Sequence, residues 1–362
     1  MNDEQDVSAA AREFAIDGEF VSAKPYGSGH INDTYSAVFR QPGTTARYLL
    51  QRINTRIFSN PVALMDNIQR VTMHLAAKVA DRPDRFRRVL NLIPTRAGTF
   101  FHVDAHGRYW RAYRFIENAT TYNSVQSPQQ AFQAAKAFGE FQGLLADLPS
   151  PPLHETIPDF HDTPKRIAAL EASIASDAAG RAMLAAREID FVLARKQIAD
   201  TLINAGLPVR VTHNDTKINN VLLDDVTGEG TCVIDLDTVM PGLAPYDFGD
   251  LVRTATSTAP EDEPDLSKVT FQLPLFEALT AEYLSAAGRF LTAAEREHLV
   301  SAVKLITFEI GVRFLTDYLA GDTYFKVHRE GHNLDRCRTQ FRLVECIEQR
   351  ETEMVRLVRS ME

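Results

Sequence analysis

The sequence predicts an α+β fold with two lobes, a small β-rich N-terminal lobe and a larger, mainly helical C-terminal lobe. Up to residue 117, most segments are short runs of partly alternating apolar and polar residues, separated by Gly and Pro, as in strands. From residue 118 onward, apolar residues recur mostly every three or four positions, as in amphipathic helices. The 362 residues suffice for two domains or one two-lobed fold. We therefore expect an N-lobe over 1–117 and a C-lobe over 118–362.

The N-lobe is predicted to contain a sheet and one main helix. A short amphipathic helix is expected first, over 5–16, and the helix 61–80 follows from apolar residues at helical spacing. The runs TFFHVD and RYWRAYRFI flank the turn AHG, whose Gly107 tolerates a positive φ, so they predict a hairpin. The remaining strands are expected at 19–26, 32–41 and 46–53.

The C-lobe is predicted to be helical around one β-containing interruption. Short β-like runs at 209–223 and 231–236 surround a polar stretch. The helices are expected at 128–147, 165–175, 181–205, 267–287, 293–320 and 335–360.

Composition excludes several classes of function. The net charge is −9, which argues against a nucleic-acid partner, and we interpret the one basic cluster, 82–88, as a solvated helix end. The chain starts with an acidic, polar segment and has no long apolar run, so we expect a cytoplasmic protein without a membrane partner. Three cysteines without metal-ligand spacing favour a reducing compartment. No heptad or apolar stripe indicates a dimer, so we expect a monomer.

The polar stretch VTHNDTKINN, residues 211–220, contains the strongest chemical signal. Asp215 and Asn220 match the pattern H-R-D-x-x-x-x-N of phosphoryl-transfer enzymes, with Asn214 in place of Arg. In that pattern the Asp accepts the proton of the attacking hydroxyl and the Asn coordinates Mg²⁺. We therefore predict that Asp215 is the catalytic base, in contact with the acceptor, and that Asn220 is a metal ligand.

A second carboxylate follows in CVIDLDT, residues 232–238. Asp235 ends an apolar run and lies in the position expected of a second metal ligand, with Asp237 as the reserve candidate. Mg²⁺ prefers hard oxygen ligands from one or two carboxylates together with phosphates. These residues predict that the chain uses ATP as co-substrate and Mg²⁺ as cofactor.

The segment GSGHIN, residues 27–32, resembles a Gly-rich phosphate loop with Asn at the third Gly position. Alone it is more typical of an ordinary hairpin turn; combined with the two aspartate motifs it favours phosphate binding. We predict that Gly27, Ser28 and Gly29 contact the nucleotide. His30 and Asn32 are predicted to contact the acceptor, and they would also reach the phosphates.

HNDTKINN followed by IDLD, after a β-rich lobe, resembles the aminoglycoside phosphotransferase/choline kinase family. The resemblance implies a bilobal protein-kinase-like fold with MgATP between the lobes. The family motif H-x-D-x-x-x-x-N corresponds to His213, Asp215 and Asn220, and the family's metal aspartate corresponds to Asp235. A further family aspartate corresponds to Asp247 in PYDFGDLVR, and we expect it to hold the catalytic loop.

Several blocks across nearly the whole chain, including PYGSGHINDTY and GVRFLTDYLAGDTYF, resemble the members of this family that phosphorylate N-acetylhexosamines. The resemblance implies a sugar acceptor, GlcNAc or GalNAc, and transfer to its anomeric C1 hydroxyl. Another acceptor of the same family, such as an aminoglycoside, a choline-like amino alcohol or another sugar, stays open. A nucleotide-binding pseudokinase is the third alternative.

The sequence departs from the general kinase pattern in its phosphate-binding residues. Gln51 stands at the position of the β3 lysine, and Gln69 is the nearest match to its glutamate partner. Loss of both members leaves no unpaired buried charge. Arg52 should point to the other face of the strand, so Lys217 is predicted to supply the cation near the γ-phosphate, and Gln51 to bind the nucleotide. In the kinase interpretation, backbone groups near Glu117 bind adenine.

Glu309, Arg313 and Asp317 follow one another at i,i+4 spacing in EIGVRFLTDYL. They predict either an ion ladder along one helix face or an Arg313 that points into the site and donates to sugar hydroxyls. The family resemblance favours substrate binding by Arg313, since the planar guanidinium fixes the orientation of a ligand.

Overall fold

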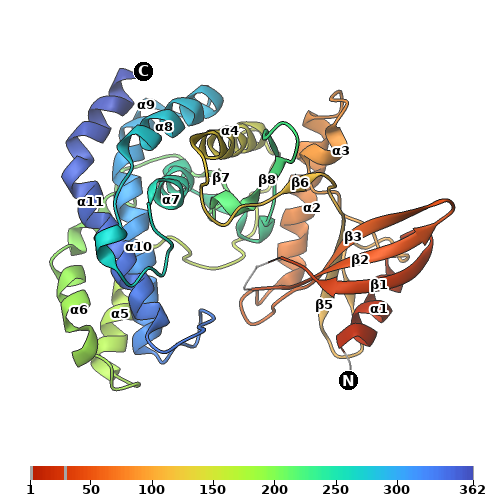
Figure 1. The fold of residues 1–362 in the computed structure, drawn as a ribbon, viewed down its shortest axis with the longest axis horizontal. Helices are drawn as coiled ribbons and strands as arrows, with labels where there is room; N and C mark the ends of the chain where they lie inside the picture. Colours follow the sequence, from red (N-terminus) through yellow and green to blue (C-terminus); the bar gives the residue numbers. More distant parts are fainter. Residues whose placement is uncertain (1–2, 28–30, 362) are drawn as a thin grey trace.

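The computed structural model describes residues 3–27 and 31–361 and has two lobes (Figure 1). The N-terminal lobe contains an antiparallel sheet of five strands in the order β1-β2-β3-β5-β4. These strands are β1 (Glu19–Pro25), β2 (Asp33–Gln41), β3 (Thr44–Arg52), β4 (His102–Val103) and β5 (Tyr109–Arg114). The predicted strands and hairpin are confirmed, although the first arm of the hairpin contributes only two residues to the sheet.

Helix α1 (Asp3–Glu13) packs on the N-lobe sheet. Its apolar face places Val7, Ala10 and Ala11 in one buried cluster with strand residues that include Phe39 and Trp110. Burial of this face stabilises a helix that is too short to be stable alone.

Helix α2 (Pro61–Lys78) starts from the side-chain cap of Asn60 and packs against the C-lobe. Its buried Ile68 belongs to the same cluster as Phe138 of the C-lobe. The Asn67 amide donates to the carbonyls of His154 at 2.8 Å and Val239 at 3.1 Å. The helix of the N-lobe is thereby fixed to the C-lobe.

The basic cluster forms the short helix α3 (Arg85–Arg88), and its predicted role as a solvated helix end is wrong in part. Arg87 pairs with Asp224 at 2.7 Å and donates to the carbonyls of Glu117 and Asn118. Arg88 donates to the carbonyl of Gly230 at 2.9 Å. The cluster therefore ties the connection between the lobes to the C-lobe.

The C-lobe is mainly helical, with short strands around the polar stretch (Figure 1). Its helices are α4 (Pro128–Leu145), α5 (Thr163–Ser176), α6 (Ala186–Leu193), α7 (Ala244–Thr256), α8 (Leu273–Ala287), α9 (Ala293–Glu297), α10 (Leu299–Leu319) and α11 (His332–Ser360). Its strands are β6 (Ala119–Thr120), β7 (Arg210–Thr212), β8 (Val221–Asp224), β9 (Gly230–Val233) and β10 (Met240–Gly242). The chain passes from the N-lobe sheet to this lobe between β5 and β6, since β6 pairs with β8.

Helix α7 is not among the predicted helices, although its polar residues Asp247, Asp250, Arg253 and Thr254 recur along one face at helical spacing. All of its residues except Thr254 are buried. At Gly249 a Cβ would lie 2.6 Å from the carbonyl oxygen of Ala302 in α10. The glycine therefore permits the close approach of the two helices.

Two predicted helices are interrupted in the structure. The segment 181–205 contains α6 between two 3-10 turns, Met183–Ala185 and Lys196–Asp200. The segment 293–320 is divided at His298, where α9 ends and α10 begins. In both places the helical spacing of apolar residues continues across the interruption, so the sequence pattern does not indicate where the helix ends.

The described residues bear on two expectations from composition, those about membrane-spanning helices and about the cysteines. None of the helices in ranges 3–27 and 31–361 is both long and apolar enough to cross a bilayer. The three cysteines, Cys232, Cys337 and Cys346, are buried and unpaired.

Candidate active site

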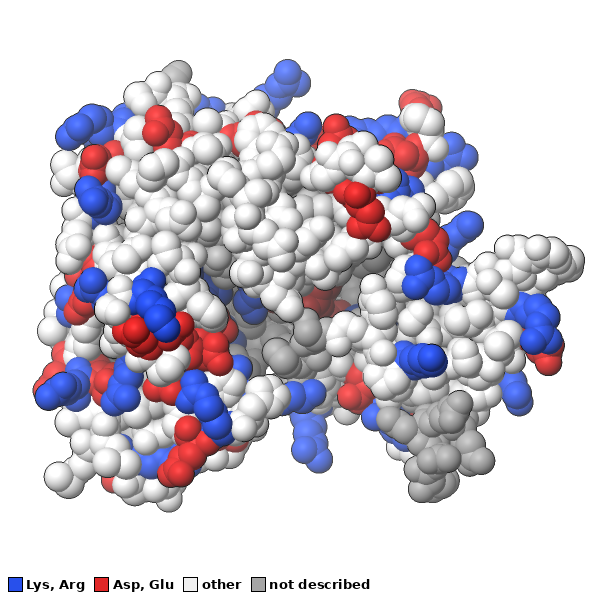
Figure 2. Space-filling view, in the orientation of Figure 1, with Lys and Arg blue, Asp and Glu red and all other residues white. Residues whose placement is uncertain are grey.

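The polar stretch and the segment 235–238 lie where the lobes face one another. Asn32 and Arg111 of the N-lobe both donate to the carboxylate of Asp237 in the C-lobe. Figure 2 shows a hollow between the lobes with acidic atoms inside it. The residues predicted to carry the chemistry can therefore be reached by ligands that also contact the N-lobe.

The hairpin of β8 and β9 brings Asn220 and Asp235 together. The two strands are antiparallel, with Val221 opposite Val233, and the backbone N–H of Ile234 donates to the carbonyl of Asn220 at 2.9 Å. Residues just before β8 and just after β9 thus lie at the same end of the hairpin. The two predicted metal ligands come from this end.

Asp247, at the start of α7, holds the catalytic loop. Its carboxylate accepts from the backbone N–H groups of His213 at 2.8 Å and Asn214 at 2.7 Å. The amide of Gln142 donates to the same carboxylate at 2.7 Å. His213 in turn bonds the carbonyl of Ile234 through its Nε2 at 2.9 Å. The expectation that Asp247 holds the catalytic loop is confirmed by these contacts.

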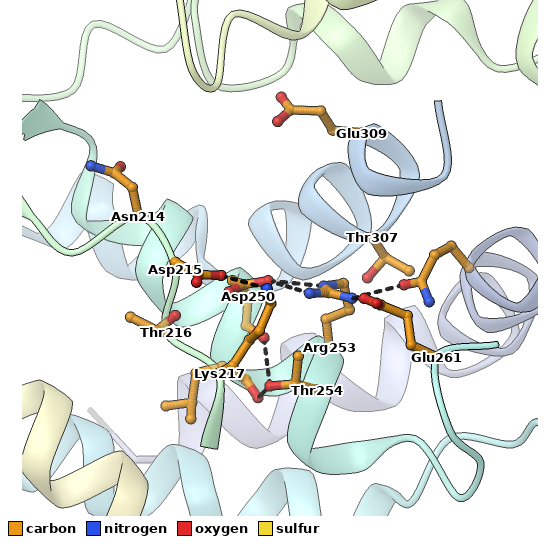
Figure 3. Close-up of polar contacts among 12 residues, drawn as sticks. Asn214, Asp215, Thr216, Lys217, Asp250, Arg253, Thr254, Glu261, Thr307 and Glu309 are labelled. Atoms are coloured by element: carbon orange, nitrogen blue, oxygen red, sulfur yellow. Dashed lines mark hydrogen bonds and ion pairs between the residues drawn. The ribbon is translucent and has the colours of Figure 1, made fainter. Parts of the chain in front are cut away.

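Asp215 is held in an ionised state by its neighbours (Figure 3). Lys217 pairs with it at 2.8 Å, and the Asn220 amide donates to its carboxylate at 3.1 Å and its carbonyl at 2.8 Å. Burial alone would raise the pKa of Asp215, but the ammonium of Lys217 holds that pKa below its ordinary value. An ionised carboxylate with 27% of its side chain exposed is able to accept a proton from a ligand hydroxyl.

Asp235 has the opposite setting. It adopts a left-handed backbone conformation with φ of 59°, and its side chain reaches solvent. Surrounding protein atoms and the negative charges of Asp237 and Asp215 raise the pKa of Asp235 to about 7. Water on the exposed side of this carboxylate screens the two like charges and so limits the rise.

The donors present fit a magnesium ion. Asn220 uses its amide hydrogens on Asp215, which directs its carbonyl oxygen away. Burial and negative neighbours raise the pKa of Asp235, which has no cation bonded to it among the described residues, so a bound cation would favour its ionised form. Carboxylate and amide oxygens are the ligands that Mg²⁺ prefers. The described residues contain no group of three or more His, Cys, Asp or Glu suited to a metal, so the remaining ligands would be phosphates and water.

Beyond Asp215, charged side chains alternate in sign (Figure 3). Arg253 of α7 is buried and donates to Asp250 at 2.7 Å and to Glu261 at 2.9 Å. Lys217 lies in the field of both carboxylates, which raises its pKa together with Asp215 despite the opposing effect of burial. Three carboxylates and two cations thus form one row that starts at the catalytic loop.

The cation at the missing β3 lysine comes from a different strand. Gln51 lies opposite Arg111 on β5, and its side-chain oxygen accepts from the Arg111 guanidinium at 2.9 Å. Arg111 forms a buried ion pair with Asp237. Gln69, the predicted helical partner, contacts Met73 of its own helix, so its assignment as the partner is wrong. Arg52 pairs with Asp33 on the other face, as the alternation predicts.

The model of the phosphotransferase enzyme family, APH, matches residues 22–298. The chain belongs to this family. It is therefore a phosphotransferase of the small-molecule kinase type, and kinases of the APH family use ATP and typically Mg²⁺. The family assignment confirms the resemblance inferred from the catalytic-loop and metal-loop motifs.

Solved structures share the whole fold of this APH-family chain. A microcompartment-associated aminopropanol kinase matches with a TM-score of 0.60 at 17% identity, covering 97% of this chain and 98% of that chain. A choline/ethanolamine kinase family protein from Mesorhizobium loti gives 0.54 and 19%, with coverage of 98% and 99%. Spectinomycin phosphotransferase, solved with ADP and spectinomycin, gives 0.54 and 12%, with coverage of 99% and 98%. At these identities the likeness concerns the fold, and it confirms the predicted bilobal protein-kinase-like architecture.

The connection between the lobes offers backbone groups at the place predicted for adenine. The Glu117 side chain pairs with Arg47, and the Glu117 carbonyl accepts from Arg87 at 3.1 Å. No hydrogen bond among the described residues uses the carbonyl of Phe115 or the N–H of Glu117. An acceptor and a donor two residues apart suit the edge of an adenine ring, and the contact of the Glu117 backbone with adenine stays a prediction.

The predicted ion ladder on α10 does not form. Glu309 bonds the Nδ1 of His161 at 2.8 Å, and Asp317 accepts from backbone N–H groups of the segment 323–325. The Arg313 guanidinium lies over the ring of Phe160 at 4.8 Å and is half-buried. The other nitrogen of His161 bonds the carbonyl of Asn214 at 3.2 Å. Through Phe160 and His161, Arg313 is adjacent to the catalytic loop, as a substrate contact requires, and its contact with substrate stays a prediction.

The predicted Gly-rich loop is described only at its ends. Gly27 has a φ of 82°, which favours glycine, whereas Ser28, Gly29 and His30 lie outside the described residues. Asn32 donates to Asp237 and accepts from the backbone N–H of Asn54 at 3.0 Å. Its amide is committed to protein groups, so its predicted contact with the acceptor would require one of these bonds to be exchanged.

Proposed function

We propose that this chain is an ATP- and Mg²⁺-dependent kinase that phosphorylates the anomeric C1 hydroxyl of an N-acetylhexosamine, GlcNAc or GalNAc. The observation that supports it is the small net charge beside the base. The three carboxylates of Asp215, Asp250 and Glu261 face the two cations Lys217 and Arg253, which leaves one net negative charge. A polycationic or quaternary-amine acceptor needs several unpaired negative charges or an aromatic cage, whereas a neutral sugar needs hydrogen-bonding groups of both kinds.

The acceptor end is suited to several hydroxyl groups. Arg313 offers donors at one side of the catalytic loop, and the buried Asp250 has one carboxylate oxygen without a hydrogen-bond partner among the described residues. Hydrogen-bonding groups that a substrate must satisfy are strong determinants of specificity. The sequence blocks that resemble N-acetylhexosamine kinases support the choice of the C1 hydroxyl.

The proposed reaction is a direct, in-line transfer. Asp215 takes the proton of the C1 hydroxyl while its oxygen forms a bond to the γ-phosphorus, and the bond from that phosphorus to the β,γ-bridging oxygen breaks to release ADP. Lys217, 2.8 Å from Asp215, can turn to the transferred phosphoryl group as its charge spreads. Asn220 and Asp235 would hold Mg²⁺, which neutralises the phosphates. Most of the acceleration then comes from position and charge.

The test is an ADP-release assay with MgATP and six acceptors: GlcNAc, GalNAc, galactose, glucose, choline and kanamycin. We expect turnover with an N-acetylhexosamine, a product that has lost its reducing end, and a phosphorus resonance coupled to the anomeric proton. In the same assay Asp250→Asn should raise KM for the sugar and leave KM for ATP unchanged. Turnover with choline or kanamycin but with no sugar would contradict the N-acetylhexosamine acceptor and favour an amine acceptor. ADP binding without turnover on any acceptor would favour a pseudokinase.

A further inference from the structure

The N-lobe lacks the lysine and helical glutamate that ordinarily align the phosphates in this fold, yet a buried ion pair stands in the same region. We infer that Arg111 and Asp237 form an ion pair between the lobes that positions Asp235 and the strand after the Gly-rich loop for MgATP. Both are positioning residues that contact neither substrate. The inference rests on the proposed function only in that the chain must bind MgATP, whatever its acceptor.

The sheet register places Arg111 where the missing charge is needed. Gln51 and Arg111 are directly opposite on neighbouring antiparallel strands, and paired residues point to the same face. The Gln51 amide donates to the Thr34 hydroxyl at 3.0 Å, and its oxygen accepts from Arg111 at 2.9 Å. Gln51 is therefore occupied on both sides and orients the guanidinium, which argues against its predicted direct contact with the nucleotide.

The carboxylate that pairs with this cation comes from the metal-binding segment instead of helix α2. Asp237 lies in the 3-10 turn Leu236–Thr238, two residues after Asp235. Its carboxylate accepts from Arg111 and from Asn32, and its backbone carbonyl accepts from the Thr156 hydroxyl at 2.7 Å. One residue thus fixes the turn that follows Asp235 to strand β5, to the start of β2 and to the C-lobe.

The burial of this pair indicates that it fixes the position of the turn after Asp235 relative to strand β5. The side chains of Arg111 and Asp237 are 1% and 4% exposed. A buried ion pair generally adds little stability beyond that of an apolar pair of similar size, while loss of one partner is costly. Arg111 also lies within the electrostatic field of Asp235, so it offsets part of the negative charge beside the predicted metal ligand while its own hydrogen bonds go to Asp237 and Gln51.

The experiment compares Arg111→Met/Asp237→Leu with the wild type by calorimetric titration of ADP at graded Mg²⁺ concentrations. The apolar pair should fold, as checked by circular dichroism and melting temperature. Loss of groups that orient metal ligands typically weakens metal binding about 10- to 100-fold, and we expect the half-saturating Mg²⁺ concentration to rise by this factor. ADP binding in EDTA should change far less. The matched control is Arg210→Met/Glu295→Gln, which removes a pair of 2.6 Å between β7 and α9 in which Glu295 is buried and Arg210 is partly buried.

Single variants separate this role from direct coordination. Arg111→Met and Asp237→Asn should raise the Mg²⁺ requirement to a similar degree, and Arg111→Lys should restore it only in part, because lysine cannot bond Gln51 and Asp237 together. An unchanged Mg²⁺ requirement in the folded double variant would overturn the inference. So would a strong effect of Asp237→Asn beside a negligible effect of Arg111→Met, which would make Asp237 a metal ligand. Failure of the wild type to bind MgADP would instead overturn the proposed function, and this inference with it.

Discussion

The two aspartates of the candidate site differ in the way the protein treats their charge. Asp215 is paired with Lys217 at 2.8 Å and accepts an amide hydrogen of Asn220, so its pKa lies below the ordinary value. Asp235 has no bonded cation among the described residues and faces two like charges, which together with burial raise its pKa. The charge of the proposed base is thus stabilised by the protein itself, whereas the proposed metal ligand would be ionised most readily beside a bound cation.

The largest expected effect comes from removal of the base. Asp215→Asn keeps the shape of the side chain and its contact with Asn220 but cannot accept the proton, so we expect kcat to fall about 10²- to 10⁴-fold, the usual contribution of a general base. The affinity for MgADP, measured by calorimetry, should stay near that of the wild type. Activity above one-tenth of the wild-type value would remove Asp215 from the role of base.

A smaller effect is expected from Asp247, which holds the backbone of the two residues before Asp215. The carboxylate of Asp247 accepts from two backbone N–H groups and from Gln142. In Asp247→Asn an NH2 group replaces one of its oxygens, and this group would face an N–H donor that it cannot bond. Hydrogen bonds to charged groups contribute about 1.5–3 kcal/mol each, and we expect a loss of unfolding free energy of about 2–3 kcal/mol in urea titrations. Since the loop also loosens, kcat should fall more than KM for ATP rises.

Asp250→Asn is the matched comparison for Asp247→Asn, because both residues lie in α7 and are buried. Asp250 bonds the Arg253 side chain and makes no contact with the backbone of the catalytic loop. If both variants lowered kcat equally, the contacts of Asp247 with the loop would not explain its effect.

The sequence predicts this contrast only in part. Asp215, Asn220 and Asp235 lie within 21 residues of one another, and the hairpin of β8 and β9 brings Asn220 and Asp235 to one end. The sequence motif therefore predicts that the three side chains lie in one site. The cation for the N-lobe could not be found in the same way. Arg111 is 60 positions from Gln51 and 126 from Asp237, and only the pairing of β3 with β5 and the approach of the lobes join the three.

The fold shows the same division between local and long-range information. Strands bounded by Gly and Pro and helices with one apolar face were predictable because each has its own period. Helix α7 is buried on its polar face as well as on its apolar face, and the break at His298 interrupts a continuing apolar pattern. In each case packing with other elements decides the structure, and a single segment does not contain that information.

The smallest expected effect is a pH dependence that belongs to Asp235 alone. Its folded-state pKa of about 7 is above the ordinary value near 3.8, so folding favours the protonated form. The protonated carboxyl therefore stabilises the folded state. This stabilisation is complete below the ordinary pKa near 3.8 and is lost as the pH rises through about 7. In EDTA, the wild type should therefore lose stability relative to Asp235→Asn between pH 5 and 7.5, by on the order of 1 kcal/mol after allowance for solvent screening. Urea titrations at the two pH values measure the difference, and Mg²⁺ should stabilise the wild type more at pH 7.5 than at pH 5. An equal pH dependence in both proteins would mean that Asp235 is ionised without a cation, and the contrast with Asp215 would disappear.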